Sequence, residues 1–279
     1  MSRNPFQNTV AIVTGGASGI GRALCEALGR HGATVVVADV DESGAKQVAD
    51  AIPGGRAQAA TLDVTQGEAV RALVEATVRE HGRLDYLFNN AGVALAAEVR
   101  DMTLEHWRRI LDVHLWGVIH GTMSAYPIML RQGFGHIVNT ASIAGLLPGP
   151  VMTAYSTAKH AIVGLSLSLR CEAAELGVRV SVVCPGFVRS RIFERAAVVQ
   201  PRWDEPREVF QACLDAAVPP ERMMDCTRAA EAILAGVRRN RGLIIFPFRT
   251  WLAWWLYRLW PPLLRPIAQS TLAAFRGQP

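Results

Sequence analysis

The stretch Thr9-Val10-Ala11-Ile12-Val13-Thr14-Gly15-Gly16-Ala17-Ser18-Gly19-Ile20-Gly21 decides the fold of this chain. Its first five residues form a continuous apolar run, which is typical of a parallel strand buried on both faces. A helical pattern through Leu24, Ala27 and Leu28 follows. Glycines between a strand and a helix let the backbone approach a phosphate, and the helix N-terminus supplies free N–H groups. This order predicts a dinucleotide site, although a glycine-rich turn alone also serves as a simple tight turn.

A second apolar run, residues 34–38, ends at Asp39. In folds of this kind an acid about 20 residues after the glycines holds the adenosine ribose. The alternative is an Asp that only begins a solvated turn, since Asp41 and Ser43 follow. No Arg or Lys lies in the glycine loop or directly after Asp39 to accept a 2′-phosphate, so the sequence favours NAD over NADP.

The remaining chain alternates between strands and helices. Strands are predicted at residues 57–62, 84–88, 137–140, 178–183 and 243–246, and helices at 67–80, from Tyr155 through Leu169, and at 225–238. Thr103 is predicted to N-cap a long helix that runs through Met123. The alternation predicts one α/β domain over residues 1–279, a doubly wound, Rossmann-type parallel sheet of about seven strands flanked by helices.

The pentapeptide Tyr155-Ser156-Thr157-Ala158-Lys159 carries the expected chemistry. Residues four apart on a helix share a face, so the Tyr155 hydroxyl and the Lys159 ammonium can meet. A nearby ammonium favours the phenolate, which is a general base at neutral pH. The alternative is a chance pair, but of 29 basic residues only Lys46 and Lys159 are lysine. Because arginine cannot replace a compact ammonium, this rarity supports a specific role for Lys159.

Composition fits a well-filled domain in a reducing cytoplasm. Of the 279 residues, 50% are hydrophobic and 19% are charged, which excludes disorder. The five cysteines show no CxxC spacing and the seven histidines show no ligand spacing, so no metal is assigned. The N-terminus lacks the apolar segment of a secretory signal. The net charge of +5 comes from residues 232–279, which hold seven Arg and no acid, so no nucleic-acid partner is expected.

Six motifs in order resemble the short-chain dehydrogenase/reductase family, in its compact, non-extended branch. They span about residues 8–247 and are Thr14 to Gly21, Asp63, Asn89-Asn90-Ala91-Gly92, Ser142, Tyr155 to Lys159, and Pro185-Gly186. The resemblance implies the strand order 3-2-1-4-5-6-7 and a homodimer or homotetramer. An extended-branch epimerase or dehydratase fits less well, because the glycine spacing is GxxxGxG and no large C-terminal substrate domain follows.

The resemblance also implies cofactor-binding residues. Asp39 would bind the adenosine ribose, and Asp63 with Val64 would bind the adenine. The pyrophosphate would lie on the glycine loop, and the rest of the cofactor would lie along the Asn-Asn-Ala-Gly segment and the segment that begins with the Pro-Gly turn. The implied residues are Gly15, Ser18, Gly19, Ile20, Gly21, Asn90, Ala91, Gly92, Pro185, Gly186, Val188 and Ser190. Ser190 replaces the threonine that the family more often has and keeps the hydroxyl.

By the same resemblance the chain interconverts a secondary alcohol and a ketone with NAD(P). Tyr155 would exchange the proton, Ser142 would hold the substrate oxygen, and Lys159 would hold the nicotinamide ribose and lower the pKa of Tyr155. One residue departs from the pattern: His114 stands where the family commonly has Asn. A neutral imidazole has a donor and an acceptor, so His114 could relay protons, or it could only pack at a helix kink.

Residues 187–224 are predicted to cover the substrate. Their apolar side chains, together with the C-terminal segment, favour a bulky apolar alcohol or ketone; they are Phe187, Phe193, Val198, Val199, Trp203 and Phe210. A non-enzymatic cofactor-sensing regulator on the same fold is the alternative function. Such regulators can lose catalytic residues, whereas Ser142, Tyr155 and Lys159 are all present.

The C-terminal extension, residues 248–279, is rich in Trp and Arg. Arg249 and Arg258 leave only eight residues between them, whereas a spanning helix needs about 20 apolar residues, so it should not cross a bilayer. Three interpretations are open: packing on the substrate cleft, packing on a neighbouring subunit, or peripheral membrane contact through residues 248–265, as in a membrane-peripheral lipid or steroid reductase. Against membrane contact, Arg258 shares a helical face with Trp251, Trp254 and Trp255, so the polar face is poorly separated.

Overall fold

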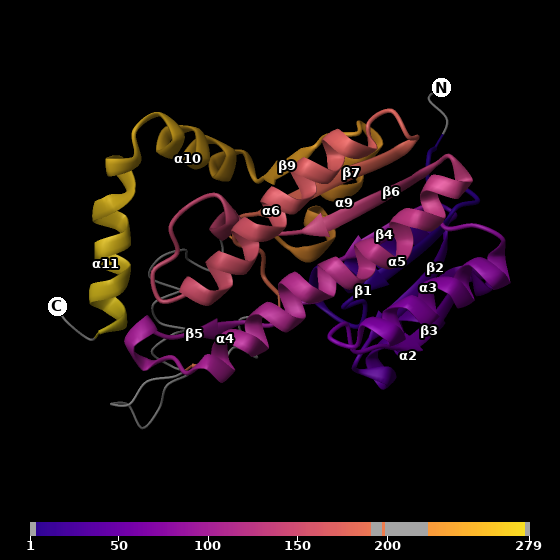
Figure 1. The fold of residues 1–279 in the computed structure, drawn as a ribbon, viewed down its shortest axis with the longest axis horizontal. Helices are drawn as coiled ribbons and strands as arrows, with labels where there is room; N and C mark the ends of the chain where they lie inside the picture. Colours follow the sequence, from indigo (N-terminus) through magenta and orange to yellow (C-terminus); the bar gives the residue numbers. More distant parts are fainter. Residues whose placement is uncertain (1–3, 191–196, 199–222, 277–279) are drawn as a thin grey trace.

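The computed structural model describes residues 4–190, 197–198 and 223–276. Its central feature is one parallel sheet of seven strands in the order β3-β2-β1-β4-β6-β7-β9 (Figure 1). The strands are β1 (Val10–Thr14), β2 (Thr34–Asp39), β3 (Ala57–Thr61), β4 (Tyr86–Asn89), β6 (Gly135–Thr140), β7 (Val178–Pro185) and β9 (Leu243–Phe246). The predicted doubly wound sheet and its strand order are confirmed; the two remaining strands, β5 (Leu95–Ala96) and β8 (Ala197–Val198), pair with each other outside this sheet.

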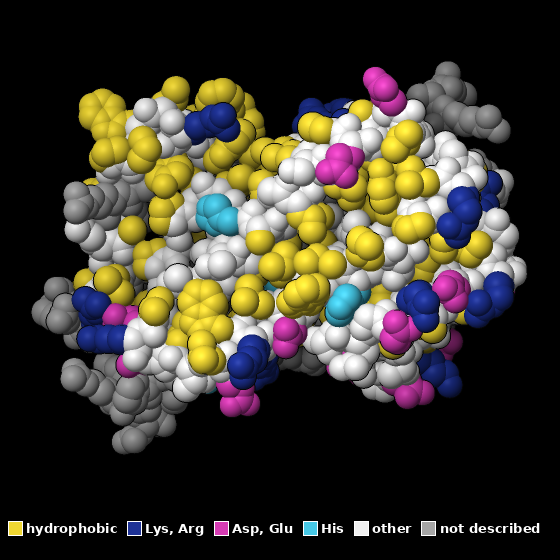
Figure 2. Space-filling view, in the orientation of Figure 1, with side chains coloured by type: hydrophobic (Ala, Val, Ile, Leu, Met, Phe, Trp, Pro, Cys, Tyr) yellow, Lys and Arg dark blue, Asp and Glu magenta, His cyan; other side chains and the backbone are white. Residues whose placement is uncertain are grey.

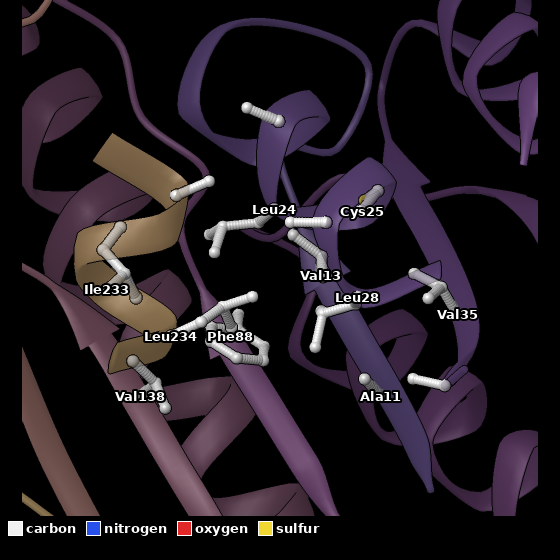
Figure 3. Close-up of a cluster of buried hydrophobic side chains, with 14 of the residues drawn as sticks. Ala11, Val13, Leu24, Cys25, Leu28, Val35, Phe88, Val138, Ile233 and Leu234 are labelled. Atoms are coloured by element: carbon white, nitrogen blue, oxygen red, sulfur yellow. The ribbon is translucent and has the colours of Figure 1, made fainter. Parts of the chain in front are cut away.

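Helices cover both faces of this sheet. One face carries α1 (Gly19–Arg30), α2 (Glu42–Ala51) and α9 (Cys226–Arg238), and the other carries α3 (Gly67–His81), α5 (Gly117–Gln132) and α6 (Thr153–Ala173). Neighbouring strand residues point to opposite faces, so Val35 and Val37 pack under α1 while Val36 joins the other cluster. Figure 3 shows the first cluster, in which side chains of α1 and α9 meet on the strands.

The long helix predicted from Thr103 is not continuous. Thr103 caps α4 (Leu104–Leu111) as predicted, because its hydroxyl accepts a hydrogen bond from the His106 N–H at 3.4 Å. A π-helical segment, Asp112–Trp116, then separates α4 from α5. Such single-turn π segments occur frequently at functional sites, and this one carries His114.

Within the predicted substrate-covering region, only residues 187–190, 197–198 and 223–224 lie in the described part of the chain. Phe193, Val199, Trp203 and Phe210 lie outside the described residues. Between them, the two-residue strand β8 (Ala197–Val198) pairs in parallel with β5 (Leu95–Ala96), beside the short helical turn η2 (Val99–Asp101). A strand this short leaves no periodicity in the sequence, so it could not be predicted.

The C-terminal extension forms two helices, α10 (Phe248–Leu259) and α11 (Arg265–Phe275), joined by the turn η6 (Pro261–Leu264). Because α10 follows directly from β9, both helices lie at the carboxyl-end side of the sheet (Figure 1). The end of α11 is attached to the domain by the buried Phe275 and by Arg276, which donates to both Glu98 carboxylate oxygens at 2.8 and 2.7 Å. Among the described helices, none is long and apolar enough to span a bilayer.

Candidate active site

A cavity of about 420 Å³ lies at the carboxyl ends of the strands, where open parallel sheets bind ligands. It brings together all but one of the residues that the sequence singled out for the site. These lining residues are Gly15, Ser18, Gly19, Ile20, Asp39, Asp63, Val64, Asn90, Ala91, Gly92, His114, Ser142, Tyr155, Lys159, Pro185, Gly186, Val188 and Ser190. The exception, Gly21, lies behind the glycine loop, where a Cβ atom would collide with the Gly15 carbonyl oxygen.

The glycine loop is shaped for close approach of a phosphate group. Gly15 and Gly19 have left-handed φ angles of 68° and 56°, which other residues rarely adopt. A Cβ atom on Gly15 would lie 2.8 Å from the Ala91 Cα, so no larger residue fits there. The Ser18 side chain does not cap α1, which leaves the helix N-terminus to an anion. These features fit a dinucleotide pyrophosphate.

Hydrogen bonds between neighbouring strand ends fix this loop. The Thr14 hydroxyl oxygen accepts from the Asn90 and Ala91 N–H groups at 3.0 and 3.1 Å. The Asn90 side-chain amide donates back to the Thr14 carbonyl at 3.1 Å. The ends of β1 and β4 are therefore tied together, which sets the width of the channel between the glycine loop and the Asn89-Asn90-Ala91-Gly92 segment.

Asp39 ends β2 at the rim of the same cavity. Its two carboxylate oxygens accept from the Ala17 and Asp41 N–H groups, each at 3.0 Å. The two hydrogen bonds fix the direction of the carboxylate towards the glycine loop. An oriented carboxylate at this position can accept hydrogen bonds from ribose hydroxyls and repels a phosphate.

Ser142, Tyr155 and Lys159 come from two elements that meet above β6. Ser142 lies two residues past β6 and its Oγ accepts from the Ala144 N–H at 3.2 Å. Tyr155 and Lys159 lie one turn apart near the start of α6, and the Lys159 Nζ is 5.4 Å from the centre of the Tyr155 ring. The Nζ donates to the Thr140 carbonyl at 2.8 Å, which fixes the lysine between α6 and the end of β6.

Burial dominates the ionisation of this group. It raises the pKa of Tyr155 to about 12, while a hydrogen bond with Ser142 acts in the opposite direction. Burial also lowers the pKa of Lys159 to about 7. The pKa of the neighbouring Cys184 thiol is raised to about 12 for the same reason. The protein surroundings alone therefore favour the neutral phenol.

His114 lies buried beside Tyr155. Its ring packs edge-on against the Tyr155 ring, with centroids 5.1 Å apart. Its Nε2 is 2.6 Å from the Val93 carbonyl oxygen and 3.2 Å from the Val93 backbone nitrogen. The imidazole is therefore held against the backbone of Val93, which lines the cavity. Burial, and next the charge of Lys159, hold the pKa of His114 well below 6.5, so the imidazole is neutral at physiological pH.

Among the lining residues that were not predicted, two have polar side chains, Arg109 and Thr140. Arg109 of α4 lines it, four residues before the lining residue Val113, but the helical period alone does not say which face of α4 turns to the cavity. Thr140 lines it and holds Lys159 through a backbone carbonyl, which leaves no signal in the sequence. Arg109 adds a cation to a site where the sequence placed only Lys159.

A doubly wound sheet with a glycine loop and a Ser-Tyr-Lys group in one cavity defines a nucleotide-dependent oxidoreductase. The family model for short chain dehydrogenases matches residues 9–198, and the chain belongs to the short-chain dehydrogenase/reductase family. It is therefore an enzyme that acts on CH–OH donors with a nicotinamide cofactor as acceptor.

Individual relatives agree with this assignment. The chain is 37% identical over 218 residues to a cyclohexanol dehydrogenase of Acinetobacter sp. (strain SE19), covering 75% of this chain and 87% of that protein. A short chain dehydrogenase/reductase from Burkholderia phymatum in complex with NAD superposes with a TM-score of 0.79 at 31% identity, over 95% of this chain and 92% of that one. A 3-ketoacyl-(acyl-carrier-protein) reductase from Brucella melitensis complexed with NADH superposes with a TM-score of 0.74 at 26% identity, over 86% of this chain and 96% of that one.

Proposed function

We propose that this enzyme is an NAD-dependent dehydrogenase that interconverts an apolar secondary alcohol and its ketone. The observation that carries the proposal is the meeting of Ser142, Tyr155 and Lys159 in one cavity with the glycine loop. The similarity to a cyclohexanol dehydrogenase supports an apolar alcohol as substrate. The reductase from Brucella melitensis indicates that related folds also act on ketone groups in the reverse direction.

Each catalytic residue has one task. The Tyr155 oxygen takes the alcohol proton, and the Ser142 hydroxyl donates a hydrogen bond to the substrate oxygen and stabilises developing negative charge. Lys159, whose Nζ donates to the Thr140 carbonyl, would bind the nicotinamide ribose. Bound NAD supplies the hydride acceptor, so the alcohol loses one hydride and one proton and becomes a ketone.

Because the pKa of Tyr155 is raised, its surroundings have to stabilise the phenolate for the reaction to proceed near neutral pH. Bringing a phenol with a pKa of about 12 to a pKa near 7 requires about 7 kcal/mol of preferential phenolate stabilisation. Because the value of about 12 already includes the hydrogen bond with Ser142, this stabilisation would have to come from the ammonium form of Lys159 and the positive nicotinamide ring. Because burial lowers the pKa of Lys159 to about 7, catalysis should be sensitive to pH in this range.

NAD is the proposed cofactor rather than NADP. The Asp39 carboxylate is held by two backbone N–H groups at the cavity rim, and the next residue is the exposed Val40 rather than a basic side chain. A 2′-phosphate would meet this carboxylate. Arg109 is the one basic side chain besides Lys159 among the described lining residues, so the preference has to be measured rather than read from charge alone.

His114 is proposed as a positioning residue and not as a proton relay. Its neutral ring is held through Nε2 on Val93, and its edge contact fixes the Tyr155 ring. A neutral imidazole relays a proton through both ring nitrogens, and here Nε2 is held by the Val93 backbone. This interpretation favours the packing alternative for the residue that departs from the family pattern.

The proposal is tested by incubating the purified chain with NAD and a panel of cyclic, aryl, steroid and long-chain secondary alcohols while NADH absorbance is followed. Turnover of at least one alcohol that Ser142→Ala slows at least 100-fold is expected. A cofactor-sensing regulator would bind NADH and give no turnover with any alcohol or ketone. Light scattering on the same preparation tests the homodimer or homotetramer that the family resemblance implies.

A further inference from the structure

Helix α10 presents an exposed apolar sector to the surroundings. At about 100° per residue, six apolar side chains fall within a sector of about 140°. All six are exposed, from 39% for Trp251 and Trp255 to 75% for Leu259; the others are Phe248, Leu252 and Leu256. Hydrophobic side chains gather over α10 in the space-filling view (Figure 2).

The aromatic rings of this sector form a connected surface. Phe248 stacks on Trp251 with centroids 5.6 Å apart, and Trp251 lies 5.9 Å from Trp255. Beyond α10, Trp260 and Leu263 are also exposed, at 68% and 51%, so the apolar surface continues into the turn η6. Contiguous exposed apolar surface of this kind marks an interaction site in a monomer.

The polar and apolar faces of α10 are separated better than the sequence predicted. Trp254 and Tyr257 are only partly exposed and lie outside the apolar sector, whereas Trp251 and Trp255 lie within it. Arg258 and Arg249 are both exposed and lie about 20° beyond the two edges of the apolar sector. The Arg258 guanidinium lies 5.7 Å from the Trp254 ring centre, at the border between the two faces.

We propose that α10 docks this enzyme onto the surface of a membrane that contains anionic phospholipid. Tryptophan beside arginine suits the lipid interface, where the rings enter the headgroup region and the guanidinium groups meet phosphates. The charge is complementary, because Arg249 and Arg258 flank the apolar sector and residues 248–279 hold no acid that would repel an anionic surface. The described helices include none that could span a bilayer, so the contact is peripheral.

A second copy of this chain fits the face less well. In a symmetric pairing through this sector, each subunit would place Arg249 and Arg258 against a segment that itself holds no acid. The pairing would then bring like charges together at the edges of the apolar interface. An anionic lipid surface provides both the apolar depth and the negative charge.

The opposite face of α10 packs on the active site. Thr250 is buried, and a Cβ atom on Gly186 would collide with its hydroxyl, so α10 rests on the Pro185-Gly186 turn that lines the cavity. A docked α10 therefore holds the carboxyl-end side of the sheet beside the lipid. The benefit of this arrangement rests on the proposed function, because an apolar alcohol substrate would be concentrated at the lipid surface.

The test is co-sedimentation of the full chain with vesicles of phosphatidylcholine alone or with phosphatidylglycerol added. The wild type should bind the anionic vesicles, and binding should weaken with salt. The paired variant Trp255→Gln with Leu259→Gln should bind at least tenfold less, as should Arg249→Gln with Arg258→Gln. Leu104→Gln, at an exposed apolar position on α4, is the matched control and should bind like the wild type.

Two results would overturn the proposal. In the first, the wild type stays in the supernatant with both kinds of vesicle. In the second, the α10 variants leave vesicle binding unchanged but reduce the mass measured by light scattering, which would assign the face to a second copy. Turnover of a small water-soluble alcohol should stay within twofold of wild type in all these variants, so failure of the dehydrogenase proposal would be recognised separately.

Discussion

Replacement of Lys159 by methionine should make the protein more stable near neutral pH while removing its activity. The Lys159 side chain is 3% exposed, and burial lowers its pKa from 10.5 to about 7. That shift corresponds to a cost of about 5 kcal/mol for holding the ammonium in the folded state. The cost is fully present below pH about 7 and is relieved as the pH rises towards 10.5, where the unfolded chain also loses the proton.

Methionine fills similar space without the charge, but the variant loses the hydrogen bond to the Thr140 carbonyl. A hydrogen bond from a charged group contributes about 1.5–3 kcal/mol, so at pH 6 the variant should be more stable by about 2–3 kcal/mol. Between pH 7 and 9 this advantage should shrink by about 1.4 kcal/mol per pH unit, because the wild type regains stability. Turnover should be lost at every pH.

The assay is urea unfolding of both proteins at pH 6, 7, 8 and 9, analysed as the difference in free energy of unfolding. Lys46→Met, at the exposed position of the only other lysine, calibrates the removal of a lysine from the surface. A wild type that is more stable than Lys159→Met at pH 6, or a difference that does not change with pH, would refute the reasoning that burial dominates at this position.

Three further predictions concern the cavity wall. Asp39→Ala should reduce the ratio of kcat/KM for NAD over NADP at least tenfold, and an unchanged ratio would remove Asp39 from ribose recognition. His114→Asn should leave the pH–rate profile between pH 5.5 and 8 superimposable on that of the wild type, because burial keeps the pKa of His114 well below 6.5. If the wild-type profile has an inflection that the variant lacks, His114 is a proton relay after all. Gly186→Ala should lower the free energy of unfolding by about 1–3 kcal/mol, because the added methyl group would overpack against Thr250. Adding Thr250→Ala should recover part of this loss; if the losses of the two single variants are additive instead, the two residues are not in contact.

The sheet could be predicted because its strands are short apolar runs buried on both faces. Residues 243–246 were predicted as a strand with the observed bounds, and the glycine loop was placed between β1 and α1. The site followed from the sheet, since residues after the carboxyl ends of parallel strands meet at one edge. Ser142 and the Pro185-Gly186 turn were located in this way.

Other features depend on tertiary packing and leave no period in the sequence. The π-helical segment Asp112–Trp116 interrupts a pattern that reads as one helix, and only the unusual His114 pointed to a kink there. The orientation of α10 is fixed by Thr250 on Gly186, which leaves Trp254 partly buried and Trp251 exposed. The helical period alone does not tell which side of the helix packs on the domain.

The most direct test of the central claim is the turnover of Tyr155→Phe at saturating cofactor, together with its affinity for NADH. Phenylalanine keeps the ring that packs edge-on against His114 but has no proton to exchange. The account predicts that kcat falls about 100- to 10,000-fold while the Kd for NADH stays within threefold of wild type. A variant that binds NADH normally and retains more than a tenth of the wild-type kcat would contradict it.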